Sequence, residues 1–153
     1  EVLERYDLAY NGSESAGKGD HNTAVGKLRN ALTRQLYHDP YIRWHFAEVR
    51  GLQNKTVKQI QNLEFGMRSE RSGPAIRSSL AKNFMDVGEH QKAAQVIADM
   101  EERFGIIDEM LPFQIQVLAK AGNDSKAKAL LVKCKVVHPM LAKQCESAYR
   151  KET

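Results

Sequence analysis

Apolar residues recur every three or four positions along most of the chain. This spacing places them on one face of an α-helix, which has 3.6 residues per turn. Strand-like alternation bounded by turn residues is hard to find, and glycine and proline are sparse, at 10 and 4 residues. The pattern therefore predicts an all-α fold.

One set of positions recurs within the helical pattern with a period of 34 residues, and a one-residue insertion puts the first copy, at Gly19, 69 residues before the copy at Gly88. In each copy a glycine is followed by a small residue at an offset of five and by apolar or small residues at offsets of nine and twelve. The copies are Gly19, Ala24, Leu28 and Ala31; Gly88, Ala93, Ile97 and Met100; and Gly122, Ala127, Leu131 and Cys134. A degenerate copy lies between the first two, with Asn54 at the turn, Leu63 at the offset of nine and Gln59 in place of alanine.

These offsets describe a helical hairpin. A glycine ends the first helix because a positive φ costs it little, and a small residue lets the second helix pack closely on the first. The later apolar positions share one face, since steps of three or four residues each make about one turn. Pro40 and Pro74 are also 34 residues apart, each placed where a helix begins.

The repeated residues resemble the consensus of the tetratricopeptide repeat (TPR) family, most specifically in the second half of the chain. The matching positions are Ala81, Phe84, Gly88, Ala93 and Ile97 in the third repeat, and Gly122, Ala127, Leu131 and Pro139 in the fourth. The resemblance implies one domain over residues 1–153, an α-solenoid of about four antiparallel helix pairs with a C-terminal capping helix. The repeats span about 1–38, 40–70, 74–104 and 107–137, and the cap spans 139–150.

Within this layout the helix pairs are expected at 1–17 with 21–38, 40–52 with 55–70, 74–87 with 90–104, and 107–121 with 124–137.

The segment "NGSESAGKGD", residues 11–20, places Gly12, Gly17 and Lys18 at the spacing of a nucleotide-binding P-loop. A P-loop follows a buried strand and has Ser or Thr after the lysine to hold magnesium. Here Gly19 follows the lysine, and the preceding residues have helical charge spacing. Because Gly19 also occupies the turn position of the repeat, we expect a turn between helices and not a phosphate-binding loop.

Composition and charge narrow the function classes further. The net charge of +4 is spread along the chain, whereas a nucleic-acid-binding protein more often concentrates its charge in a stripe or tail, so no nucleic-acid partner is expected. No apolar run reaches the length of a membrane span, and no insertion of this segment into a membrane is expected. The histidines do not cluster, and no catalytic arrangement stands out. The sequence therefore predicts a protein without enzymatic activity, metal or cofactor.

Cys134 and Cys145 flank the predicted turn at Pro139, five residues before it and six after it. In an antiparallel hairpin these positions are level with each other. A disulfide there would clamp the closing helix and imply an oxidising compartment. Two reduced, buried thiols explain the same residues equally well, and the sequence leaves both alternatives open.

By analogy with the family, the first helices of successive pairs line a concave groove that captures a segment of another protein. The residues matched to groove positions are Tyr41, Trp44, His45, Glu48, Ser78, Lys82, Met85, Gln116 and Lys120. Trp44 is the leading candidate, because "YIRWHF" holds more aromatic and imidazole side chains than one buried stripe accommodates, with Arg43 among them. Alternatively, Trp44 packs the first repeat against the second.

The sequence therefore favours a non-catalytic scaffold that binds a peptide or helix of a partner protein in its groove. The alternative is a periplasmic accessory domain of a bacterial membrane glycan polymerase or ligase, or of a secretion or pilus system. Because the chain begins at Glu1 and not at Met, we expect a processed chain or an excised domain, periplasmic or tethered to a membrane protein. A cytoplasmic location is the alternative, and the oligomeric state is not predicted.

Overall fold

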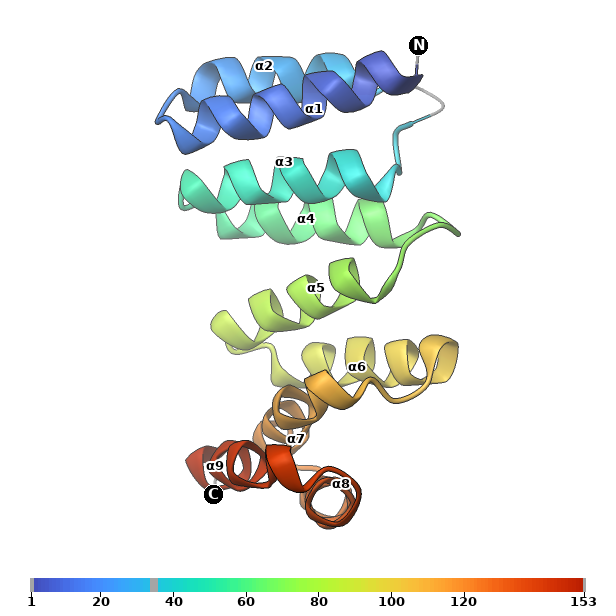
Figure 1. The fold of residues 1–153 in the computed structure, drawn as a ribbon. Coiled ribbons are helices and arrows are strands. Elements are labelled where there is room, and N and C mark those ends of the chain that lie inside the picture. Colours follow the sequence, from blue (N-terminus) through green and yellow to red (C-terminus); the bar gives the residue numbers. More distant parts are fainter. Residues whose placement is uncertain (1, 34–35, 153) are drawn as a thin grey trace. The chain divides into compact units, whose positions relative to one another are not determined.

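The computed structural model describes residues 2–33 and 36–152, and this part of the chain contains helices and turns but no strand (Figure 1). The all-α prediction is confirmed. The α-helices are α1 (Val2–Gly17), α2 (His21–Ala31), α3 (Pro40–Leu52), α4 (Thr56–Met67), α5 (Pro74–Asp86), α6 (His90–Phe104), α7 (Leu111–Lys120), α8 (Asp124–Val137) and α9 (Ala142–Glu152). Two short 3-10 helices, η1 (Asp108–Met110) and η2 (Pro139–Leu141), precede α7 and α9.

The chain divides into two compact units, Glu1–Asn83 and Phe84–Thr153. In the first unit α1 lies beside α2 and α3 beside α4, and both helices of the first pair contact α3 (Figure 1). In the second unit α7 contacts α6, α8 and α9. Among the described helices, none combines the length and the apolar character needed to cross a bilayer.

Four turns between helices share one backbone geometry. Gly19, Asn54, Gly88 and Gly122 have φ angles of 88°, 57°, 80° and 84°, which confirms the predicted turn positions. In each turn this residue donates its N–H to the carbonyl three residues earlier, and the next residue donates to the carbonyl five residues before itself. These are the two hydrogen bonds of a Schellman motif, which satisfy the last carbonyls of a helix.

The start of each following helix is fixed by the same turn. The residue that follows the turn residue accepts, through its carbonyl, the N–H of the residue four positions later. This later position is the one predicted to be small, and it is occupied by Ala24, Gln59, Ala93 and Ala127. The three alanines are completely buried.

Gln59 is accommodated differently from these alanines. Its side-chain amide lies over Gly51, where a Cβ atom would come within 2.7 Å of Nε2. Because Gly51 has no side chain, there is room for the side chain of Gln59, which stands where the other copies have alanine.

The P-loop-like segment is helical over residues 11–17 and forms the expected turn only at Lys18 and Gly19. Gly12 and Gly17 both lie within α1, and Lys18 follows at its end, so the segment is no loop after a strand. A Cβ atom on Gly12 would approach the carbonyl oxygen of Ala24 and Cγ of Leu28 at 3.1 Å each. Gly12 thus serves the close packing of α1 on α2.

Four predicted helix bounds are wrong by three residues or more, and one of them is the start of the closing helix, which was expected at 139 and lies at Ala142. The helix expected over 21–38 ends at Ala31, because Leu32 is extended and the Thr33 hydroxyl accepts the N–H of Leu36 in a local turn. The helix expected over 55–70 ends at Met67, whose carbonyl accepts the Ser72 hydroxyl. The helix expected from 107 begins as an α-helix only at Leu111, since Pro112 lacks an N–H and suits the first turn.

Two buried arginines hold the connections that precede α3 and α5. Arg43 donates from Nε to the carbonyl of Tyr37 at 2.7 Å, and its exposed fraction is 6%. Arg77 donates from Nη1 to the carbonyl of Ser72 at 3.1 Å and is 1% exposed. Both arginines lie three residues after the proline that begins the helix, in the sequences "PYIR" and "PAIR". This repeated motif ties each irregular connection to the helix that follows it.

Cys134 and Cys145 form a disulfide between α8 and α9, with their Cα atoms 6.7 Å apart. Of the two alternatives that the sequence left open, the structure contains the bond. Both sulfur-bearing residues are completely buried, in a cluster with Leu111 and Ile115 of α7. The predicted closing helix is therefore anchored covalently, and it begins at Ala142 after η2.

Gly66 and Gly26 offer a matched pair of tests for close helix packing. A Cβ atom on Gly66 would lie 2.4 Å from Cδ1 of Ile76 and 3.0 Å from Cβ of Arg43, whereas one on Gly26 meets nothing within 4 Å. We expect Gly66→Ala to lower the free energy of unfolding by about 1–3 kcal/mol through overpacking. Gly26→Ala, at an exposed helical site, should raise it by about 0.5–1 kcal/mol. Urea denaturation measures both, and a neutral Gly66→Ala would contradict the packing.

Loss of the disulfide is expected to destabilise the second unit. The variant Cys134→Ala/Cys145→Ala should lose about 3 kcal/mol, the contribution of a short closed loop. Thermal unfolding followed by far-ultraviolet circular dichroism measures this loss, and a reductant should shift the wild type but leave the variant unchanged. The single tryptophan, Trp44, lies in the first unit, so its fluorescence reports that unit separately.

Candidate functional site

One side of α3 carries the predicted groove residues Tyr41, Trp44, His45 and Glu48, at helical steps of three and four. Asp39 caps this helix, since its Oδ1 accepts the N–H groups of Tyr41 and Ile42 at 3.1 Å each. Pro40 follows the cap in the first turn. The cap and the proline fix where α3 starts and hence where these side chains lie.

Four rings form what we call the aromatic cluster, which consists of Tyr6, Tyr41, Trp44 and His45. Tyr41 contacts Tyr6 of α1 edge-on, with ring centroids 5.2 Å apart, and contacts His45 at 4.5 Å. Trp44 contacts His45 at 5.3 Å. Tyr41 remains 42% exposed, and a partly exposed aromatic side chain presents a large apolar surface that is already held in place.

Asp39 connects the cluster to the rest of the first unit. This buried carboxylate accepts the Tyr6 hydroxyl at 2.7 Å and pairs with Arg71 at 2.9 Å, both through Oδ2. Burial and the neighbouring Asp39 raise the pKa of Tyr6 above its usual value. The hydroxyl therefore stays protonated and acts as a hydrogen-bond donor.

A polar group of three residues lies beside the cluster. The imidazole Nδ1 of His45 is 3.4 Å from Oε2 of Glu48, and the Ser13 hydroxyl donates to the same oxygen at 3.2 Å. The geometry between His45 and Glu48 is too poor for a hydrogen bond, so Nδ1 is buried without a hydrogen-bond partner. Burial lowers the pKa of His45, and the nearby Glu48 carboxylate partly opposes this shift.

Tyr41 and Trp44 line a pocket of about 280 Å³ between the starts of α3 and α5, which we call the Tyr–Trp pocket. Its lining consists of Pro40, Tyr41, Trp44, Gly73, Ala75 and Ile76. The indole Nε1 of Trp44 donates to the Ser79 hydroxyl at 3.4 Å, a long hydrogen bond. Trp44 therefore contacts α5, as a packing residue does, and also forms part of an open apolar surface.

Arg43 points away from this surface, although the sequence places it among the aromatic residues. Its guanidinium lies over the rings of Tyr37 and Phe65, at 4.5 and 4.7 Å, and donates to Oδ1 of Asn62 at 2.8 Å. Burial lowers the pKa of Arg43. The role of Arg43 is to hold α3 to α4 and to the preceding connection.

The other predicted groove residues lie on α5 and in the second unit. Ser78 is half-buried and Lys82 is exposed on the part of α5 that belongs to the first unit. Met85, Gln116 and Lys120 belong to the second unit. Gln116 and Phe113 of α7 line a shallow hollow of about 440 Å³ together with residues of α9, among them Lys143 and Ser147.

Sequence reasoning missed Tyr6. The first helix lacks the family's consensus residues, so no repeat position drew attention to it. Tyr6 lies 35 residues before Tyr41, and the hydrogen-bonded pairs Ser13–Glu48 and Trp44–Ser79 have the same separation. Moving back one period from Tyr41, with the one-residue insertion included, would have found it.

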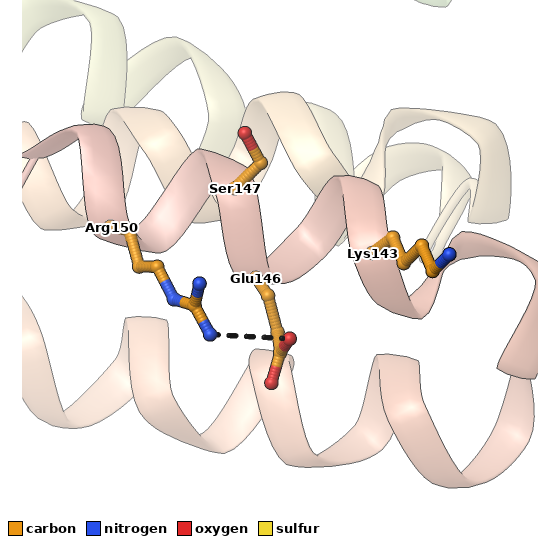
Figure 2. A pocket seen from close by; sticks show the side chains of 4 residues that line it. All are labelled: Lys143, Glu146, Ser147 and Arg150. Atoms are coloured by element: carbon orange, nitrogen blue, oxygen red, sulfur yellow. Dashed lines mark ion pairs between the residues drawn. The ribbon is translucent and has the colours of Figure 1, made fainter.

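A second hollow, of about 440 Å³, lies along α9 and is lined by Lys143, Glu146, Ser147 and Arg150 (Figure 2). Arg150 Nη2 is 3.6 Å from Oε2 of Glu146, and Lys135 of α8 pairs with the other oxygen. Lys135, followed by Arg150, lowers the pKa of Glu146. The hollow is cationic overall, with its one carboxylate paired.

Metal chemistry and relatedness give no further assignment. Within residues 2–33 and 36–152, no group of three or more His, Cys, Asp or Glu side chains is arranged to hold a metal ion. No protein-family model matches the sequence, and no significant match is found among curated proteins or solved structures.

The buried imidazole makes the stability of the first unit depend on pH. Because the pKa of His45 is lowered in the folded state, the unfolded chain binds a proton more readily as the pH falls below the ordinary histidine value of about 6.5. Stability is therefore full above that pH and declines below it. His45→Gln should weaken this decline in urea titrations at successive pH values.

Nuclear magnetic resonance titration of the His45 ring tests the cause of the shift. The pKa should lie below the ordinary value, and Glu48→Gln should lower it further, since the carboxylate stabilises the imidazolium. A pKa above the ordinary value in the wild type would contradict the role assigned to burial.

Proposed function

We propose that the chain is a non-catalytic, TPR-like scaffold that binds a peptide or helix of a partner protein across the aromatic cluster of its first unit. The observation that carries this proposal is the Tyr–Trp pocket beside the partly exposed rings of Tyr41 and Trp44. Aromatic side chains held in position lose little entropy on binding, and tryptophan and tyrosine are enriched among residues that dominate interface energies.

The four equivalent turns support the assignment to a helical-repeat scaffold. Each turn places a small or accommodated residue at the same offset, and contacts between α1, α3 and α5 join side chains one repeat apart. In such scaffolds the first helices of successive pairs present a shared surface to ligands.

The alternative, a periplasmic accessory domain of a membrane glycan polymerase or ligase, or of a secretion or pilus system, is favoured by the disulfide. Disulfides form and persist in oxidising compartments and are rare in the cytosol. The two proposals are compatible, because an accessory domain can act by binding a partner segment.

Substitution of Trp44 tests the binding surface. A peptide library derived from the proteins that co-purify with the chain supplies the ligand, and fluorescence anisotropy measures its Kd. Trp44→Ala should weaken binding by about thirtyfold or more, the loss typical of a dominant interface residue. The control Val57→Ser removes an apolar side chain that is 71% exposed on α4 and should leave the Kd unchanged. Equal Kd values for wild type and Trp44→Ala would reject this surface.

A further inference from the structure

The outer face of α8, in the second unit, carries an apolar stripe. The binding function proposed for the first unit does not involve this stripe. Val132 and Val136 are 62% and 73% exposed, and Met140, just beyond the helix, is 95% exposed. Together with Ala129, these two valines lie at helical steps of three and four on one side. The completely buried Ala127 and Cys134 lie on the opposite side. Helix α8 is therefore apolar on two opposite faces, one in the core and one in solvent.

Lysines border the exposed stripe on both sides. At 3.6 residues per turn, Lys126 and Lys133 fall on one flank and Lys128 and Lys135 on the other. Residues 125–145 contain five lysines and neither Asp nor Glu. This segment concentrates positive charge that the chain as a whole spreads out.

The cationic flank continues from α8 onto α9. Lys135 reaches Glu146, the carboxylate in the hollow that Lys143 and Arg150 also line (Figure 2). Lys128 pairs with Asp124 at 3.0 Å. Asp124 and Glu146 thus each hold a lysine in place. Two further carboxylates lie nearby, since Glu101 lines a hollow with Lys126 and Ala129, and Asp108 pairs with His138 at 3.0 Å. The five lysines of residues 125–145 still outnumber these carboxylates.

We infer that this face, defined by Val132, Val136 and Met140 with the bordering lysines, docks on the surface of an anionic lipid bilayer. A helix that lies in a membrane interface places an apolar stripe at the acyl boundary, and lysines on its flanks extend their ammonium groups to the lipid phosphates. The stripe and its two cationic borders match that environment. Nucleic acid would use the lysines but not the valines. Docking requires no span, in agreement with the absence of a spanning helix among the described residues.

Co-sedimentation with vesicles tests the inference on the full chain. Vesicles of phosphatidylcholine with about one-third phosphatidylglycerol should bind the protein, and vesicles of phosphatidylcholine alone should not, because each surface lysine gains energy only near anionic lipid. Lys126→Gln/Lys133→Gln should weaken binding by about fivefold for each lysine. Val132→Ser/Val136→Ser should weaken it by about tenfold through lost burial of apolar surface.

A variant with the same net charge separates the surface from overall charge. Lys18→Gln/Lys58→Gln removes two exposed lysines of the first unit and should leave vesicle binding unchanged. Equal losses in the two lysine pairs, or full binding by the valine variant, would overturn the inference. A lack of vesicle binding at low salt would also overturn it. This holds even if an acidic partner protein binds through the same lysines. Circular dichroism confirms that each variant is folded.

Discussion

A single backbone arrangement, the left-handed residue between two helices, recurs at four turns, and three of these turns join helices that pack on each other, α1 with α2, α3 with α4 and α7 with α8. In the turn at Gly19, Asp20 donates its N–H to the end of α1 and accepts, through its carbonyl, the first hydrogen bond of α2. The end of one helix and the start of the next therefore share a residue, and no further linker residue separates the two helices. The residue five positions after the turn residue, an alanine in three of the four copies, donates its N–H to the carbonyl of the residue that follows the turn residue. Asn54 shows that this constraint outweighs residue preference, since it adopts a φ of 57° that favours glycine.

The second constraint acts between helix pairs, and buried arginines supply it in the first unit. The connections before α3 and α5 follow no regular pattern, and their carbonyls need donors once they leave solvent. Arg43 and Arg77 provide these donors from the helix that follows. A guanidinium suits this task because it offers several N–H groups in a fixed plane and stacks on aromatic rings, as Arg43 does on Tyr37. Removal of either arginine would leave buried carbonyls without donors, a larger loss than that of the charge alone.

Features that depend on residues nearby in the chain could be predicted from the sequence, and features that depend on residues of another helix could not. Turns depend on neighbours in the chain, so Gly88 and Gly122 marked their turns correctly. The end of α2 was missed because an apolar period continues past Ala31, while the local hydrogen bonds of Thr33 compete with the helix. The burial of Arg43 was missed because it depends on Phe65 and Asn62, which lie on another helix. The motif Pro-x-Ile-Arg, present twice, was the available signal. Spacing placed Cys134 and Cys145 level with each other, but bond formation depends on side-chain directions that spacing does not give.

The repeat explains why the two proposed surfaces stand out. Turn hydrogen bonds and core packing fix the residues at the turn and at offsets of five, nine and twelve, and leave the outward positions free. Folding alone would accept polar side chains at those free positions. Tyr41 on α3 and Val136 on α8 are apolar although they remain 42% and 73% exposed. Such residues are informative about function because the fold does not require them. The chemistry around them then separates the two surfaces. Rings with a pocket suit a peptide side chain, whereas small apolar residues bordered by lysines suit a flat, anionic interface.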